Sequence, residues 1–168
     1  IIISEKGMES IRPFPKVAER PCIFERIYFS RPDSMLGGNT VYSYRKNLGI
    51  ELAKEHQVDA DTVVPVPDSG VPAALGYAQQ SSMPFELGII RNHYVGRTFI
   101  EPSQSIRQFG VKLKHNANVS YIKNKKVILI DDSIVRGTTA KKIIKMIYDA
   151  GAKEVHLGIA CPPIKHPD

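Results

Sequence analysis

The stretch "KKVILIDDSIVRGTTAKKIIKMIYDAG", residues 125–151, decides how this chain folds. Its apolar residues 127–130 are typical of a short buried strand, and two aspartates follow them directly. A polar loop containing one glycine and two threonines comes next. Behind it, apolar residues repeat at helical spacing at Ala140, Ile143, Ile144 and Ile147. The stretch therefore predicts a strand, a polar loop and a helix, in that order.

The ends of this helix carry their own signals. Thr138 or Thr139 is expected to cap its start with a hydroxyl, and Gly151 suits its end. Further helices are expected at residues 40–56 and 71–80. Further strands are expected at residues 22–29, 62–67, 85–90 and 154–160.

Alternating strands and helices indicate an α/β fold, with a mostly parallel twisted sheet and helices on both faces. Residues 1–21 carry scattered prolines and are expected to be an irregular lead-in, followed by one domain over residues 22–168. In open sheets of this kind, ligands bind at the carboxyl ends of the strands. The loops after residues 67, 90 and 130 are therefore the candidate ligand-binding loops.

Composition sets wider limits. The chain has 168 residues, 42% of them hydrophobic and 24% charged, which suits one globular domain. No apolar run is long enough to span a membrane. Cys22 and Cys161 have no metal-ligand spacing, so we expect two buried thiols in a reduced, cytoplasmic protein. The net charge of +6 indicates an anionic partner.

Asp131 and Asp132 stand at the carboxyl end of the most apolar predicted strand. Two adjacent carboxylates repel each other, so a cation or hydrogen-bond donors should compensate them. They suit Mg²⁺ or the hydroxyls of a ribose. The loop over residues 133–139 enters a helix, where backbone N–H groups favour an anion. A ribose 5-phosphate would suit both the aspartates and the loop. Alternatively, the aspartates are merely solvated at the strand end, and a threonine merely caps the helix.

The motif that contains this site, "VILIDDSIVRGTT", resembles the phosphoribosyl-pyrophosphate (PRPP) signature of type I phosphoribosyltransferases. Together with "RPCIFERIYFSRPDS", "VVPVPDSG" and "NHYVGRTFIEPSQSIRQFGVKLKHNAN", the chain is similar to the glutamine PRPP amidotransferase family over residues 12–168. That resemblance implies conversion of PRPP and ammonia to phosphoribosylamine and pyrophosphate, the first step of de novo purine synthesis.

The resemblance also implies roles for individual residues. It places PRPP against the loop after the strand at residues 62–67 and against the aspartate motif: Asp68, Ser69, Gly70, Asp131, Asp132, Ser133, Ile134, Val135, Arg136, Gly137, Thr138 and Thr139. It assigns Mg²⁺ to Ser69, Asp131 and Asp132.

Residues 91–117 are long for a connection within a compact domain and strongly basic. Resemblance to the family makes this segment a flexible lid that orders when PRPP binds. Arg91, Arg97 and Thr98 are then expected to be catalytic, as contacts to pyrophosphate. Relatives usually have Lys at position 91 and Arg at position 93, where this chain has Arg91 and His93.

Two features depart from the family. Its N-terminal glutaminase, which supplies ammonia from glutamine, is not in this sequence, so we expect a piece truncated at both ends. One branch of the family binds an iron–sulfur cluster, for which Cys22 matches one ligand but Asp168 replaces another. No cluster is therefore expected. The resemblance further implies a homo-oligomer inhibited by purine nucleotides.

Three alternatives stay open. A nucleobase-salvage phosphoribosyltransferase would keep the aspartate motif but needs a base-recognition hood, which we do not find. A PRPP-sensing regulator that binds nucleic acid is compatible with the charge of +6, but its basic residues form no recognisable reading motif. Nucleic acid is therefore not the expected partner. A fragment that catalyses nothing is the third alternative.

Overall fold

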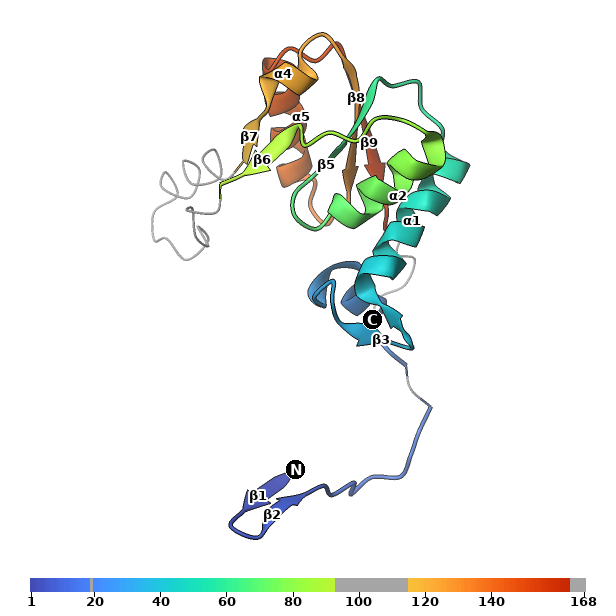
Figure 1. The fold of residues 1–168 in the computed structure, drawn as a ribbon, viewed down its shortest axis with the longest axis vertical. Helices are drawn as coiled ribbons and strands as arrows, with labels where there is room; N and C mark the ends of the chain where they lie inside the picture. The colour runs from blue at the N-terminus through green and yellow to red at the C-terminus, as the bar shows by residue number, and fades with distance from the viewer. Residues whose placement is uncertain (19, 93–114, 164–168) are drawn as a thin grey trace.

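A computed structural model describes residues 1–18, 20–92 and 115–163. Its centre is a parallel sheet of three strands in the order β5-β8-β9 (Figure 1). These strands are β5 (Thr62–Pro65), β8 (Lys126–Asp131) and β9 (Glu154–Ile159). Phe85 adds a single parallel bridge to Val63 on the outer side of β5. The predicted parallel α/β sheet is thus confirmed.

Helices cover both faces of the sheet, as predicted (Figure 1). On one face lie α1 (Val41–Glu55) and α2 (Val71–Ser81), which enclose a core containing Tyr77 and Ile128. The other face is covered by α5 (Thr138–Asp149) and the short α4 (Val119–Ile122). Strand β8 contributes side chains to both cores, and its residues 127–130 are buried.

The contact between α1 and α2 depends on two glycines. A Cβ atom on Gly49 would lie 1.8 Å from the carbonyl oxygen of Ala73, and one on Gly76 would lie 2.0 Å from that of Lys46. The backbones therefore approach more closely than any side chain would allow. As a result, α1 buries Val41, Arg45, Gly49 and Ala53. The larger apolar residues at helical spacing after Val41 are only partly buried: Tyr44, Leu48 and Leu52.

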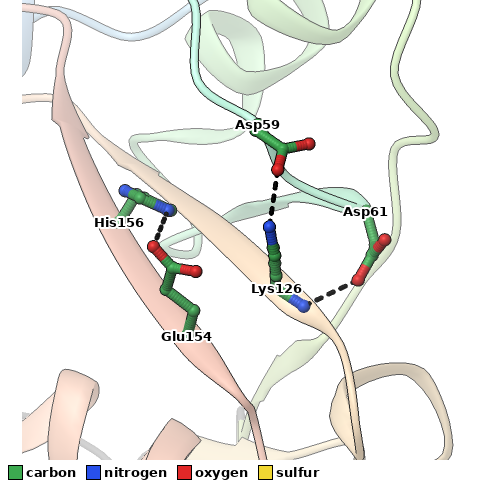
Figure 2. Close-up of polar contacts among 5 residues, drawn as sticks. All are labelled: Asp59, Asp61, Lys126, Glu154 and His156. Atoms are coloured by element: carbon green, nitrogen blue, oxygen red, sulfur yellow. Dashed lines mark hydrogen bonds and ion pairs between the residues drawn. The ribbon is translucent and has the colours of Figure 1, made fainter.

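The amino-terminal ends of the strands are joined by polar contacts (Figure 2). Asp61 accepts a hydrogen bond from the backbone N–H of Lys126 over 2.8 Å, and the Lys126 ammonium lies 2.5 Å from Asp59. On β9, His156 Nε2 lies 2.9 Å from Glu154 Oε1. The contacts of Lys126 join the segment before β5 to the start of β8, at the end of the sheet opposite to Asp131.

Several predicted elements were wrong. Residues 22–29 form no strand; their main element is a π-helical turn, η1 (Glu25–Phe29). The buried Arg45 explains the difference, because its guanidinium donates to the backbone carbonyls of Arg26 and Ser30, both over 2.9 Å. Local β propensity here loses to a tertiary contact.

The predicted strand at residues 85–90 was right only in part. Only Phe85 bridges to β5, while β6 (Ile89–Arg91) pairs antiparallel with β7 (His115–Ala117) outside the main sheet. Gly88 lies between the two pairings, where a Cβ atom would meet Val64 Cγ2 at 2.8 Å. The chain changes partner at this close approach.

The amino-terminal segment is more regular than expected. It forms a hairpin of β1 (Ile2–Ser4) and β2 (Gly7–Glu9), which stands away from the sheet in Figure 1. A second small hairpin joins β3 (Met35–Leu36) to β4 (Asn39–Thr40). The expected burial of the thiols was wrong too, since Cys22 is exposed and Cys161 is half-buried. No helix in the described part of the chain is long and apolar enough to span a membrane.

Candidate functional site

The predicted site gathers at the carboxyl ends of β5, β8 and β9. Asp131 is the last residue of β8, and its carbonyl accepts from the N–H of Ala160 over 3.0 Å. The Asp132 carbonyl accepts from the N–H of Cys161 over 2.9 Å, and Val66 N–H donates to Ile130 over 2.9 Å. The neighbouring strand ends therefore fix the backbone of both aspartates.

Asp132 carries the most informative side chain of the site. Its residue is 6% exposed, and Oδ1 accepts a hydrogen bond from the Ser133 hydroxyl over 2.7 Å. Its second oxygen, Oδ2, is buried and has no hydrogen-bond partner among the residues that the structure describes. Buried carboxylate oxygens are rarely left unpaired, because desolvation without a partner is costly. This oxygen therefore suits a ligand, either a metal ion or a hydroxyl donor.

Asp131 lies beside it, half-buried. Burial, together with the neighbouring charge of Asp132, raises the pKa of Asp131 to about 6. The N–H of Asp132 donates to Asp131 Oδ1 over 2.9 Å, which opposes the shift only in part. The folded chain thus holds two adjacent carboxylates that are incompletely compensated, as expected for a site that receives a cation or donors.

Arg45 was not anticipated from the sequence. It is 4% exposed, and burial lowers the pKa of its guanidinium, while the charge of Asp132 acts in the opposite direction. Its position four residues after Val41 places it on the buried face of α1. No sequence signal distinguishes such an arginine from an exposed one on an amphipathic helix.

The loop after β8 is mostly open to solvent. Ser133 and Gly137 are half-buried, while the other members are exposed: Ile134, Val135, Arg136, Thr138 and Thr139. Gly137 has φ +69° and is the N-cap of α5, with no side-chain hydrogen bond at the cap. The predicted capping by Thr138 or Thr139 was therefore wrong. The first N–H groups of α5 keep their capacity for an external acceptor such as phosphate.

The loop after β5 approaches the aspartates through Gly70. A Cβ atom on Gly70 would lie 2.4 Å from the carbonyl oxygen of Ile130, so only glycine fits. Ser69 is half-buried and Asp68 exposed, and the peptide bond between Pro67 and Asp68 is cis. This loop therefore lies directly beside the end of β8.

Among the residues of the predicted lid that the structure describes, Arg91 lies at the site. Arg91, at the end of β6, contacts the Asp68 carboxylate through Nη1. Arg97 and Thr98 lie outside the described residues, as does most of the predicted lid.

A hollow of about 550 Å³ lies along α1 and β9 and reaches Ala160 and Cys161. Its lining is largely apolar, including Leu48, Leu52 and Leu157, and contains no lysine or arginine among the described residues. Such a surface does not suit a polyphosphate, so size alone does not identify the site here.

Comparison with protein families decides the family. A model described as phosphoribosyl transferase domain matches residues 44–167, which include both loops and the aspartate pair. The chain belongs to this family. This match confirms the expected phosphoribosyltransferase family.

Among curated proteins, this phosphoribosyl transferase domain is 63% identical over 162 residues to an amidophosphoribosyltransferase of Rhizobium etli. That match covers 96% of this chain and 33% of the relative. It is 52% identical over 167 residues to the amidophosphoribosyltransferase of Bacillus subtilis, covering 99% of this chain and 35% of that protein. The chain thus spans about a third of the length of these relatives.

Two solved structures are similar to this chain in both fold and sequence. A glutamine PRPP amidotransferase from B. subtilis complexed with ADP and GMP superposes with a TM-score of 0.84 at 51% identity. The superposition covers 99% of this chain and 36% of that chain. A structure described as the allosteric regulatory enzyme of purine biosynthesis matches with the same TM-score, identity and coverage.

A magnesium ion fits the donors present. The described residues contain no group of three or more His, Cys, Asp or Glu side chains arranged to hold a metal. Mg²⁺ nevertheless is usually held by one or two carboxylates together with substrate phosphates and water. The unpartnered Oδ2 of Asp132, with Asp131 beside it, meets that requirement.

Proposed function

We propose that this chain is the phosphoribosyltransferase part of an amidophosphoribosyltransferase. It would convert PRPP and ammonia to 5-phosphoribosylamine and pyrophosphate, the first step of de novo purine synthesis. The observation that carries the proposal is the buried, unpartnered Oδ2 of Asp132 at the carboxyl end of the sheet. High identity to proteins named for this activity supports it.

Each loop would hold a different part of PRPP. Residues 133–139 would bind the 5-phosphate through backbone N–H groups and hydroxyls at the start of α5. Asp131 and Asp132 would accept hydrogen bonds from the ribose hydroxyls. The loop over residues 68–70 would face the pyrophosphate, where Gly70 permits close approach. Mg²⁺, held by Asp131, Asp132 and Ser69, would neutralise phosphate charge when bound.

The reaction would break the bond between ribose C1 and a pyrophosphate oxygen, whose electron pair leaves with pyrophosphate. A bond from the ammonia nitrogen to C1 would form, and the nitrogen would give up a proton to water or to the departing pyrophosphate. Positive charge near the leaving oxygens lowers the barrier to this step. Arg91, together with Arg97 and Thr98, would supply donors there.

The longer protein would add further properties. We propose that a glutaminase domain supplies ammonia from glutamine, and that purine nucleotides inhibit the enzyme. The B. subtilis relative complexed with ADP and GMP supports the second point. We further propose a cytoplasmic homo-oligomer without an iron–sulfur cluster. A salvage activity toward nucleobases is the second candidate, favoured by the family match alone.

The direct test is release of pyrophosphate from PRPP and Mg²⁺ with an ammonium salt, compared with adenine, guanine and hypoxanthine as acceptors. Ammonia-dependent release, lost in Asp132→Asn and kept in Asp149→Asn, is expected. Asp149 is a matched control because it lies at the far end of α5, paired with Lys145. Release that depends on a nucleobase instead would identify a salvage enzyme.

A further inference from the structure

Arg91 and Asp68 join two segments that are 23 residues apart in sequence. Arg91 ends β6, and Asp68 lies in the loop that follows β5. Nη1 of the guanidinium contacts Oδ2 of the carboxylate, and the two side chains are 35% and 55% exposed. The contact is therefore open enough for a ligand to reach.

The guanidinium of Arg91 is only partly used by this contact. An arginine presents donors in a planar fork, and carboxylates or phosphates commonly take two of them in parallel. Here Asp68 takes Nη1, while Nε is buried without a hydrogen-bond partner among the described residues. A lysine at this position would offer no such second donor, because its ammonium acts as a point charge. Nε of Arg91 is thus a donor that no described residue uses, and it reaches an anion only if the guanidinium moves.

Asp68 also lies in the loop that is expected to face the pyrophosphate group. If the loop over residues 68–70 faces pyrophosphate, the Asp68 carboxylate and the ligand must share one cation. A pyrophosphate carries more negative charge than a single carboxylate and has more acceptor oxygens. It can therefore take Nη1 and, once the guanidinium leaves Asp68, also Nε, whereas Asp68 takes only Nη1.

We propose that Asp68 is an internal competitor for Arg91. In the absence of ligand it holds the guanidinium at the mouth of the site, and the pyrophosphate group displaces it on binding. Asp68 is in this sense a positioning residue that acts through Arg91 and sets the affinity for pyrophosphate. The inference rests on the proposed function, since it requires pyrophosphate at this loop.

The test is calorimetric titration of inorganic pyrophosphate in the presence of Mg²⁺ into four chains: wild type, Asp68→Asn, Arg91→Gln and the double variant. Ribose 5-phosphate is titrated into the same chains as a control ligand, because it lacks the group that Arg91 would contact. Asp68 is largely exposed, so its replacement by asparagine should leave the fold intact. Asp68→Ser provides a second variant with the same expected direction.

Asp68→Asn should tighten pyrophosphate binding by about two- to fivefold, the range expected for an exposed ion pair. It should leave ribose 5-phosphate binding unchanged. In the Arg91→Gln background the same substitution should have a much smaller effect, because the competition no longer exists.

Two results would overturn the inference alone. Weaker pyrophosphate binding in Asp68→Asn would mean that Asp68 helps to hold the ligand or its metal. Equal tightening with and without Arg91 would mean that Asp68 acts only by long-range repulsion. A folded wild-type chain that binds neither ribose 5-phosphate nor pyrophosphate would refute the proposed function itself, and this inference with it.

Discussion

The Ser133 hydroxyl donates a hydrogen bond to Asp132 Oδ1 over 2.7 Å, while Oδ2 of the same carboxylate is buried and unpartnered among the described residues. Ser133 therefore fixes one oxygen of Asp132 and leaves the other without a partner among the described residues. The arrangement separates a structural contact from a binding contact within one side chain.

Removing this contact should weaken the site without abolishing it. We expect Ser133→Ala to raise the Kd for PRPP about tenfold, because a buried charged acceptor loses roughly 1.5 kcal/mol or more with its donor. Ser133→Thr keeps the hydroxyl and is the control. Calorimetric titration measures both, and an unchanged Kd in Ser133→Ala would show that the hydroxyl does not position Asp132.

Binding of PRPP should depend on the protonation of Asp131. Since its pKa is about 6, Asp131 takes up a proton as the pH falls through that value and no longer attracts a cation. The Kd should therefore rise below pH 6, with a slope approaching about tenfold per pH unit.

Phosphates of the ligand titrate in the same range. The control is the pH profile of Asp131→Asn, whose remaining slope reports the ligand alone. Identical slopes in the two chains would contradict a role for Asp131 ionisation.

The ionised carboxylate of Asp131 should destabilise the folded chain when no ligand is bound. Between pH 3.8 and about 6 the folded chain retains a proton on Asp131 that the unfolded chain has released. The free energy of unfolding contributed by this group therefore falls as the pH rises through that window. Asp131→Asn should be more stable than wild type at pH 7.5, and the gain should vanish near pH 4.

Urea unfolding at the two pH values measures this difference, with Asp149→Asn as an exposed control. A variant that is less stable than wild type at pH 7.5 would mean that the Asp131 carboxylate is well compensated in the fold.

Replacing Gly49 by alanine tests the packing of α1 on α2. At an exposed helical position this change stabilises a protein by roughly 0.5–1 kcal/mol. At Gly49 the added Cβ would lie 1.8 Å from a backbone oxygen of α2, so the helices must separate. We expect Gly49→Ala to destabilise the chain by about 2 kcal/mol or more.

Asn47→Ala, an exposed substitution on the same helix, is the control for Gly49→Ala. Unfolding in urea gives both free energies. A gain in stability from Gly49→Ala would contradict the close approach of the helices.

The sequence was sufficient for the strand that ends in Asp131 and for the amphipathic helix after it, because both elements follow from local apolar patterns. The helix expected at residues 40–56 is confirmed as α1, but the sequence did not indicate which of its faces is buried: Val41, Arg45, Gly49 and Ala53. Apart from Val41, that face carries small residues and a desolvated charge, so the apolar residues at helical spacing do not mark it. The true contact becomes visible only when α2 is in place.

Local propensity failed where the chain is held by distant groups. The segment around Ile27 has the composition of a strand, yet Arg45 binds two of its carbonyls and η1 forms instead. At the site, the order of Asp131, Asp132 and Gly137 along the chain indicated a ribose phosphate. The unpartnered oxygen of Asp132 and the contact between Arg91 and Asp68 depend on the three-dimensional fold and could not be predicted from local sequence.

The most direct test of the account is a calorimetric titration of PRPP into this chain with and without Mg²⁺, repeated on the double variant Asp131→Asn/Asp132→Asn. We predict metal-dependent binding by the wild type that the double variant loses while it remains folded. Binding of equal strength in the double variant, or no binding by a folded wild-type chain, would contradict the proposal that the aspartate pair receives PRPP.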